Sequence, residues 1–482
     1  MLFSTITFIF IYLPLVLLFF LIVKKFYGNK ISIFILIFSS LFFYAWFSIK
    51  FLFLLLFSII FNYLIIKKFK TQNSLLLLIS AIMVNLFILG YFKYRNFFLE
   101  NLELVSNFSF TYTEIFIPLG ISFFTFQQIA VLLDSYDKRA NVENFKEYFF
   151  FVSFFPQLVA GPIVLFGEMK NQIDNFLEDK NHYLYITQGF TIFIFGLFKK
   201  IVIADSLGVY VDQGFEINSI IRSFEAWILV ISYTLQIFFD FSGYSDMAIG
   251  LALMFGFRLP INFDNPFISL SIVEFWRRWH ITMSRFFMMY IYSPLALYYA
   301  RKTVDKNKYL IFFLTVFVPT IFAFFCAGLW HGAHWKFAVY GLVNGLAIAI
   351  AQFWKEQIKI NLFKEISWFL TMLTIIISFV FFRSIDIPQS ILILKSMFFL
   401  NGYDLTSNFV FQNNLFLKDS VEMIRCILLI SLCLLYFKFI PEISKQKSDL
   451  KINIKLTFLS SLMLIISLIL IDRPQPFIYF QF

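Results

Sequence analysis

The chain has 482 residues, of which 60% are hydrophobic and only 14% are charged, and its mean hydropathy is +0.81. These values exclude a water-soluble globular protein, which is about half apolar and about a quarter charged. The formal net charge of +10 does not indicate a nucleic-acid partner, because the basic residues lie in short segments between apolar runs, where they set topology and contact membrane lipids.

Apolar runs of membrane-spanning length recur along the whole chain. They must be helical, because unpaired backbone groups are too costly in hydrocarbon. With a threshold of about 18 apolar residues, they predict roughly 11 transmembrane helices, near residues 2–23, 31–48, 50–66, 75–92, 184–203, 226–257, 308–325, 337–354, 365–382, 424–440 and 455–471. The first run lacks the flanks of a signal peptide and is expected to remain as a helix. The predicted fold is therefore an all-α polytopic membrane protein.

Three further apolar segments do not suit simple spans. Segments 115–133 and 149–166 contain proline, glycine and glutamine, and segment 270–299 contains a glutamate, a histidine and several arginines. Such segments survive at membrane depth only where they line protein or a cavity. They predict re-entrant or oblique helices around a central funnel.

The chain is expected to form one transmembrane domain without internal repeats. Loop 204–224 and segment 401–422 are the longest candidates for exposed structure. The expected parts of this domain, residues 1–482, are N-terminal helices at 1–95, a catalytic core at 115–355, C-terminal helices at 365–471 and an aromatic tail at 472–482.

Basic clusters predict the orientation in a bacterial inner membrane. Cytoplasmic loops are enriched in lysine and arginine. The clusters that follow the first and third helices and precede the last consist of Lys24, Lys25, Lys30, Lys67, Lys68, Lys70, Lys445, Lys447, Lys451 and Lys455. Placing them in the cytoplasm puts both chain ends, and so the tail, in the periplasm.

Three of the four histidines lie in apolar segments. His182 is in a polar loop and is expected to be solvated, whereas His280, His331 and His334 are at membrane depth. Ionisable residues there are expensive and usually functional, and histidine often does acid–base work. A structural role stays open for His280 and His331, and His334 is expected to be structural or interfacial.

A metal site is not expected. His331 and His334 are predicted to share a helix face, and with His280 they could hold a metal, but no carboxylate follows at a spacing that would orient them. A neutral imidazole acting as general base suits these histidines better. The three cysteines have no paired spacing and indicate neither a disulfide framework nor zinc: Cys326, Cys426 and Cys433.

A second polar cluster lies in the apolar run at 239–250, with Asp240, Ser242 and Asp246. Small polar residues in a span often form hydrogen bonds between helices. Two aspartates exceed what packing needs, so these three side chains are expected to line the funnel and bind substrate or donor.

Arg277 and Arg278 are flanked by Trp276 and Trp279. Tryptophan and arginine form ordinary interfacial belts, but arginine also binds phosphate in a bidentate manner. Both interpretations remain open.

The tail ends in an aromatic hexapeptide, residues 477–482, after Pro474 and Pro476, which stop a helix. One interpretation is an aromatic anchor at the membrane interface. The other is that the hexapeptide inserts into a groove and presents the hydroxyl of Tyr479.

Several motifs, in order along the chain, resemble the membrane-bound O-acyltransferases, and the bacterial polysaccharide branch fits best. They are Pro118–Phe123 with Phe126-Gln127, Pro156–Ile163, Phe-Asp-Phe-Ser-Gly-Tyr-Ser-Asp at 239–246, Phe-Trp-Arg-Arg-Trp-His at 275–280 and Gly-Leu-Trp-His-Gly at 328–332. The resemblance runs over roughly residues 115–482.

The resemblance implies a funnel of helices with its site near mid-membrane, His331 as the catalytic histidine and His280 as the second one. It implies a cytoplasmic acyl donor, acetyl-CoA, as a substrate and no bound cofactor. The residues expected to bind donor or substrate lie in the matching motifs: Asp240, Ser242, Asp246, Arg277, Arg278 and Trp330.

The resemblance also extends to the tail. A similar hexapeptide occurs in this branch and on a small partner of the D-alanyl transfer system, where a tyrosine is thought to carry the acyl group as an ester. Carried over, that residue is Tyr479. A periplasmic SGNH/GDSL-like hydrolase-fold partner would then take the group onward to a glycan.

The sequence departs from the family at Met288 and Met289, where an Arg-Asp pair is usual, and at Asn344, where many members have histidine. These departures bear on the substrate. Alginate, other exopolysaccharides and peptidoglycan are the acceptors of this branch, and a composition typical of an AT-rich genome favours peptidoglycan.

Two alternatives remain. A transporter of an activated or lipid-linked substrate would use a polar funnel without covalent chemistry, but such proteins tend to show internal repeats. D-alanyl transfer to teichoic acid is disfavoured, because that system keeps the tyrosine hexapeptide on a separate protein.

Overall fold

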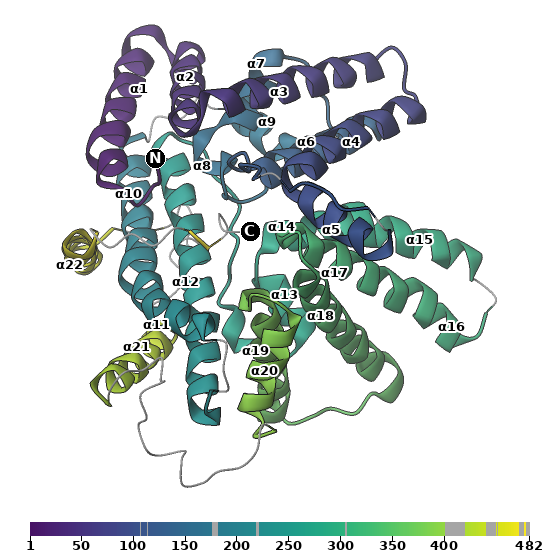
Figure 1. The fold of residues 1–482 in the computed structure, drawn as a ribbon. Helices are drawn as coiled ribbons and strands as arrows, with labels where there is room; N and C mark the ends of the chain where they lie inside the picture. The colour runs from purple at the N-terminus through teal and green to yellow at the C-terminus, as the bar shows by residue number, and fades with distance from the viewer. Residues whose placement is uncertain are drawn as a thin grey trace. The chain divides into compact units, whose positions relative to one another are not determined.

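The computed structural model describes residues 1–106, 108–112, 114–175, 182–217, 221–303, 306–400, 420–439, 450, 452–471 and 477–478. Over these residues the chain forms helices and no strands (Figure 1). It divides into two compact units. The first comprises Met1–Leu197, Tyr244–Ile261 and Gln446–Asp472, and the second comprises Phe198–Gly243, Asn262–Lys445 and Arg473–Phe482.

Eleven helices lie wholly or mainly in the first unit, with the end of α12: α1 (Leu13–Tyr27), α2 (Asn29–Phe47), α3 (Ile49–Phe69), α4 (Leu75–Leu89), α5 (Arg95–Val105), α6 (Ile121–Tyr136), α7 (Phe145–Ser153), α8 (Phe155–Leu158), α9 (Phe166–Asn175), α10 (His182–Phe198) and α22 (Ile454–Leu470). π-Helical turns precede α1 and follow α4 at Thr7–Tyr12 and Gly90–Tyr94.

A close backbone approach joins two of the unusual segments in the first unit. Gly120 has a left-handed backbone with φ of 68°, and it begins the buried helix α6. A side chain at this position would lie 2.5 Å from the carbonyl oxygen of Leu158. Only glycine suits both the positive φ and the contact, so this residue fixes how segments 115–133 and 149–166 pack together.

Buried amides connect four helices of the first unit. Asn62 of α3 and Asn85 of α4 exchange side-chain hydrogen bonds of 3.1 and 2.8 Å. Gln128 of α6 accepts from Asn62 at 3.1 Å and from the Tyr148 hydroxyl of α7 at 3.0 Å, and it donates to Ser58 at 2.8 Å. Such bonds hold helices together where no water is available.

The second unit contains the other helices: α11 (Asp205–Glu216), most of α12 (Ser223–Met254), α13 (Ile272–Arg278), α14 (Ile281–Phe287), α15 (Ser293–Lys302), α16 (Lys308–Phe312), α17 (Val318–His331), α18 (Trp335–Phe353), α19 (Lys364–Arg383), α20 (Ile387–Met397) and α21 (Ser420–Phe439). A π-helical turn, η3 (Lys199–Ala204), precedes α11, and another, η5 (Met288–Tyr292), follows α14.

Helices α17 and α18 pack tightly against each other, and α18 also packs on α19 (Figure 1). A side chain at Gly328 would collide with the carbonyl oxygen of Phe337, and one at Gly341 would collide with that of Phe324. Small residues at a helix interface let the backbones approach in this way. The contact fixes the end of α17, where His331 lies.

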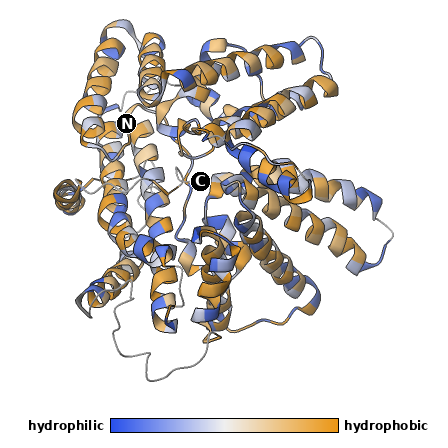
Figure 2. Ribbon diagram, viewed as in Figure 1, coloured by the Kyte–Doolittle hydropathy of each residue, from blue (hydrophilic) through white to orange (hydrophobic). Residues whose placement is uncertain are grey.

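Within the part of the chain that the structure describes, eight helical stretches are long and apolar enough to cross a membrane: Thr7–Tyr27, Asn29–Phe47, Ile49–Phe69, Leu75–Val105, Ser223–Met254, Lys308–His331, Trp335–Ile358 and Lys364–Arg383. Apolar residues follow these helices along their length (Figure 2). The predicted number of 11 is not confirmed. Runs 184–203, 424–440 and 455–471 fall in α10 with η3, in α21 and in α22, which has 17 residues.

The expectation that 204–224 is an exposed loop is wrong. Residues Asp205–Glu216 form helix α11, in which Leu207, Val211 and Phe215 are buried. These residues are four apart and form one apolar face, a periodicity that the interpretation as a loop overlooked. The other segment expected to be exposed, 401–422, lies almost wholly outside the described residues.

The three unusual segments contain helices, and the prediction that these helices are re-entrant or oblique around a central funnel stays a prediction. Helix α6 begins only after Gly120, segment 149–166 holds the end of α7 and the four-residue α8, and segment 270–299 holds α13, α14 and η5. The last of these segments belongs to the second unit and carries His280.

Candidate active site

His331 is the last residue of α17, and its side chain is buried among aromatic rings of the second unit. Only 5% of the residue is exposed. Its ring centroid lies 5.0 Å from Trp330, 5.0 Å from Phe382 and 5.8 Å from Tyr340. Gly332 then adopts an extended backbone, so the helix ends and the imidazole sits at its tip. The surrounding rings limit the orientations that this imidazole can take.

His280 lies at the bend between α13 and α14, in a left-handed backbone conformation with φ of 42°. This conformation is uncommon for a residue with a side chain. Asn262 supports the bend, because its carbonyl oxygen accepts from Ile281 N–H at 2.9 Å and its side-chain oxygen accepts from the Thr282 hydroxyl at 2.6 Å.

The indole of Trp330 contacts the rings of both His280 and His331. Trp330 lies 6.0 Å from the His280 ring and 5.0 Å from the His331 ring, between ring centroids. His280 is fully buried and also makes an edge contact of 4.6 Å with Phe241 of α12. Burial lowers the pKa of His280 to about 3, so its imidazole is neutral at physiological pH.

His334 does not share a helix face with His331, which corrects the prediction from their spacing. Helix α17 ends at His331, and His334 caps the N-terminus of α18, where its Nδ1 accepts from Lys336 N–H at 3.3 Å. Gly332 breaks the helix between them, which spacing alone did not reveal. Among the described residues, no group of three His, Cys, Asp or Glu side chains is placed to hold a metal ion.

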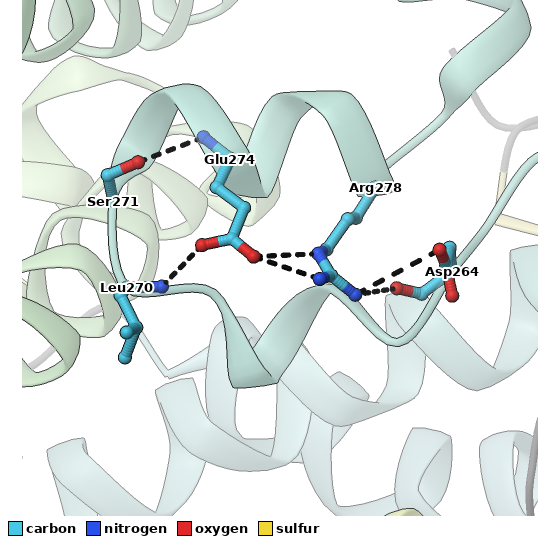
Figure 3. A network of polar contacts seen from close by, with 5 residues as sticks. All are labelled: Asp264, Leu270, Ser271, Glu274 and Arg278. Carbon is cyan, nitrogen blue, oxygen red and sulfur yellow. Dashed lines mark hydrogen bonds and ion pairs between the residues drawn. The ribbon is translucent and has the colours of Figure 1, made fainter.

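Arg278 belongs to a network that fixes α13 (Figure 3). Its guanidinium forms an ion pair of 2.9 Å with Glu274 and donates to the Asp264 carbonyl oxygen at 3.2 Å. Glu274 also accepts from Leu270 N–H at 3.0 Å, and Ser271 caps the helix by accepting from Glu274 N–H at 3.1 Å. Together these contacts hold the start of α13, and the ion pair with Glu274 and the bond to Asp264 account for Arg278 without a ligand.

Arg277 instead lines a cavity of about 310 Å³ within the second unit. The lining is mostly apolar, and Arg277 and Arg285 supply its positive charges. One wall is Ala327, one helical turn before His331 in α17. The lining residues are Val273, Trp276, Arg277, Ile281, Met283, Ser284, Arg285, Phe287, Met288, Tyr292, Thr320, Ala323, Phe324, Ala327, Ile348 and Gln352.

Two of the three positions that depart from the family pattern, Met288 and Asn344, lie at this cavity. Met288 is part of its lining. Asn344 is fully buried, and its side-chain oxygen accepts from the indole N–H of Trp276, another lining residue, at 3.3 Å. Asn344 thus holds the wall of the cavity through Trp276.

Asp240 forms a buried ionic cluster with two residues that sequence reasoning did not single out. Lys200 Nζ lies 2.6 Å from a carboxylate oxygen of Asp240 and 2.6 Å from one of Asp205. The other oxygen of Asp240 accepts from the backbone N–H of Ile478, in the tail, at 2.9 Å. The available signal was Lys199-Lys200 within an apolar run.

The tail therefore returns to the second unit near the histidines. Phe477 and Ile478 are 2% and 5% exposed. The Phe477 ring lies 5.9 Å from Phe241, the ring that contacts His280. Tyr479 lies outside the described residues.

The last two predicted residues, Ser242 and Asp246, lie on the same helix but belong to different units. Ser242 is buried on the part of α12 that belongs to the second unit, whereas Asp246 is buried on the part that belongs to the first unit. The second unit thus brings together His280, His331, Trp330, Phe241, Asp240 and Phe477.

Comparison with known proteins identifies the family. The model of the membrane-bound O-acyltransferase (MBOAT) family matches residues 142–387, which include both buried histidines. A peptidoglycan O-acetyltransferase of Helicobacter pylori is 34% identical over 485 residues, covering 90% of this chain and 89% of that protein.

Two other relatives have different named activities. A probable alginate O-acetylase of Pseudomonas putida is 35% identical, covering 84% of this chain and 82% of that protein. A teichoic acid D-alanyltransferase of Streptococcus thermophilus is 28% identical, covering 55% of this chain and 68% of that protein. Together with the helical membrane fold, these matches show that the chain belongs to the membrane-bound O-acyltransferase family and is an O-acyltransferase.

Proposed function

We propose that this enzyme takes acetyl from acetyl-CoA in the cytoplasm and passes it across the bacterial inner membrane for O-acetylation of a periplasmic glycan, with peptidoglycan as the favoured acceptor. The extent of the match to the Helicobacter pylori peptidoglycan O-acetyltransferase, 90% of this chain, supports that acceptor. The positions of the basic clusters support an orientation with both termini in the periplasm.

One observation carries the proposal: Phe477 of the tail contacts the same ring, Phe241, that contacts the buried His280. Phe477 contacts Phe241, and Phe241 contacts His280. Trp330 continues the chain of contacts from His280 to His331. A tail that served only as an interfacial anchor would not need burial against these rings. This arrangement favours Tyr479 as the acyl carrier.

The chemistry requires one base and one good leaving group. His331, as a neutral imidazole, takes the proton from the Tyr479 phenol while the phenol oxygen attacks the thioester carbonyl carbon. The carbon–sulfur bond breaks, and the CoA thiolate leaves with the proton. The acetyl group is then a phenyl ester, which transfers readily because phenolate is a better leaving group than an alkoxide.

The cavity beside α17 suits the acyl donor. Its apolar walls can take the pantetheine arm, and Arg277 and Arg285 can bind phosphate, which arginine does in a bidentate manner. Trp330 and His280 would orient the thioester at the far end. Acetyl-CoA is thus a substrate, and Arg278 contributes through the position of α13.

A periplasmic partner with an SGNH/GDSL-like fold would accept the acetyl group from Tyr479 and place it on the glycan. Tyr479→Phe tests this relay. We expect the variant to lose both the acetyl adduct on the C-terminal peptide, measured by mass spectrometry, and the O-acetylation of the glycan in cells. Normal glycan acetylation in this variant would contradict the relay.

Acetylation of alginate or another exopolysaccharide is the second candidate, and the 35% identity to a probable alginate O-acetylase favours it. O-acetyl analysis of isolated peptidoglycan and exopolysaccharide, with and without the gene, separates the two acceptors. A transporter without covalent chemistry would form no acetyl adduct. The shorter match to a teichoic acid D-alanyltransferase gives D-alanyl transfer less support.

A further inference from the structure

Lys200, Asp205 and Asp240 form a buried ionic cluster, and the three side chains are 4%, 6% and 1% exposed. The ammonium group of Lys200 contacts one oxygen of each carboxylate. A buried carboxylate oxygen without a donor is costly. The second oxygen of Asp240, which Lys200 does not contact, therefore requires a donor of its own.

The tail supplies that donor. Ile478 N–H donates to the Asp240 oxygen that does not contact Lys200, at 2.9 Å. A hydrogen bond from N–H to an ionised carboxylate is about twice as strong as one between neutral groups. Because the donor is a backbone group, the bond fixes the path of the chain at residue 478 whatever side chain stands there.

We propose that Asp240, held by Lys200 and Asp205, is a clamp for the C-terminal tail and a positioning residue for acyl loading. Clamping of Ile478 places the next residue, Tyr479, within one peptide unit of a fixed point. The Phe477 ring on Phe241 fixes the preceding residue. The positioning role of Asp240 rests on the proposed function of Tyr479, whereas the clamp itself does not.

This role differs from that expected for Asp240 in the sequence. A funnel-lining aspartate would bind substrate directly. Both oxygens of Asp240 are instead engaged within the protein, by Lys200 and by Ile478. Asp240 therefore acts on the reaction through the position of the tail and does not touch the donor.

Hydrogen–deuterium exchange of the full-length protein in nanodiscs tests the clamp without any acyl chemistry. In Asp240→Ala, Lys200 and Asp205 remain as a neutral pair, so we expect the fold to persist. The C-terminal peptide should gain one rapidly exchanging amide, while peptides from α17 and α18 keep their wild-type exchange. Unchanged exchange of the C-terminal peptide in a folded Asp240→Ala protein would overturn the clamp.

Asp205→Asn is the matched control for exchange. It also neutralises one carboxylate beside Lys200, but it leaves the acceptor of Ile478 in place. Protection of the C-terminal peptide should therefore persist in this variant. Equal loss of protection in Asp205→Asn and Asp240→Ala would show a general effect of the cluster and would overturn the specific role of Asp240.

A substitution in the tail removes the donor and leaves the cluster intact. Ile478→Pro lacks the N–H group, and the φ of proline suits the 3₁₀ conformation at this position. Ile478→Ala is its control, because it retains the N–H. We expect Ile478→Pro to lower the rate of Tyr479 acetylation by about 10²-fold, the cost of a displacement of about 1 Å, with KM for acetyl-CoA unchanged.

The outcomes distinguish the clamp from the proposed function. Tail protection that depends on Asp240, without any acetyl adduct on wild-type Tyr479, would support the clamp and contradict the relay. An adduct that forms equally fast in Ile478→Pro and in Ile478→Ala would support the relay and overturn the positioning role of the clamp.

Discussion

Each unit of the molecule buries a polar cluster, and the two clusters differ in charge. In the first unit, Asn62, Asn85 and Gln128 bind one another and nearby hydroxyls. In the second unit, Lys200 lies between Asp205 and Asp240. The amide cluster is neutral and connects helices α3, α4 and α6. In the ionic cluster, one oxygen of Asp240 accepts from Ile478, which is 238 residues away in the chain.

This difference separates a polar cluster that holds neighbouring helices together from one that also binds a distant segment. The amides of the first cluster donate and accept among themselves and hold α3, α4 and α6 together. Asp240 has one oxygen that Lys200 does not contact, and that oxygen accepts from Ile478. The free side of the Asp240 carboxylate therefore marks where residue 478 binds.

The substitution Lys200→Met is expected to have the largest effect on stability. Lys200→Met removes the cation that contacts both Asp205 and Asp240, and it leaves the buried Asp240 carboxylate without its ion-pair partner. Breaking a buried ion pair on one side costs about 3–5 kcal/mol. Thermal unfolding in detergent should show this loss. A melting temperature equal to that of the wild type would mean that the cluster is not buried as described.

Asn62→Ala tests the other side of the comparison. It leaves the side-chain oxygen of Asn85 without its donor from Asn62 and removes one of the two donors to the side-chain oxygen of Gln128, which costs up to about 3 kcal/mol. Because the amide cluster is structural, the stability should fall while exchange of the C-terminal peptide stays as in the wild type. Faster exchange of that peptide in Asn62→Ala would contradict the claim that the amide cluster does not affect the tail.

The pH dependence of stability tests the burial of His280. Its pKa is lowered to about 3 when folded, against an ordinary value of 6.5, so below pH 6.5 only the unfolded chain takes up the proton. Stability should therefore fall as the pH drops, by about 2 kcal/mol between pH 6.5 and about pH 5. His280→Gln should lose less stability over this range, as measured by thermal unfolding at both pH values.

The smallest effect is expected for an ion pair at the periphery of the second unit. Asp212 and Arg383 lie 2.7 Å apart, and their side chains are 36% and 21% exposed. Partly exposed pairs contribute about 0–1 kcal/mol. Asp212→Asn should leave both the melting temperature and the exchange of the tail nearly unchanged. A loss as large as that in Lys200→Met would show that charge removal anywhere destabilises this unit.

The general architecture and the buried histidines could be predicted because hydrocarbon imposes strict rules on sequence. Long apolar runs gave helices, and proline and glycine gave broken segments such as the one before α6. His280 and His331 stood out because ionisable residues are rare in such runs.

Features that depend on tertiary contacts were less predictable. The helix break at Gly332 separates His334 from His331, and the amphipathic helix α11 replaces an expected loop. The partner of Asp240 at Ile478 is 238 residues away in the chain. No local pattern encodes such a contact, since it depends on how the tail returns to the fold.

The most direct test of the account is the fate of labelled acetyl-CoA on the purified enzyme. Wild-type protein should acquire one labelled acetyl group on the peptide that contains Tyr479. His331→Ala should insert and fold as the wild type does but acquire the label about 10²–10⁴-fold more slowly, the usual contribution of a general base. Loading of Tyr479 at the wild-type rate in folded His331→Ala would contradict the account.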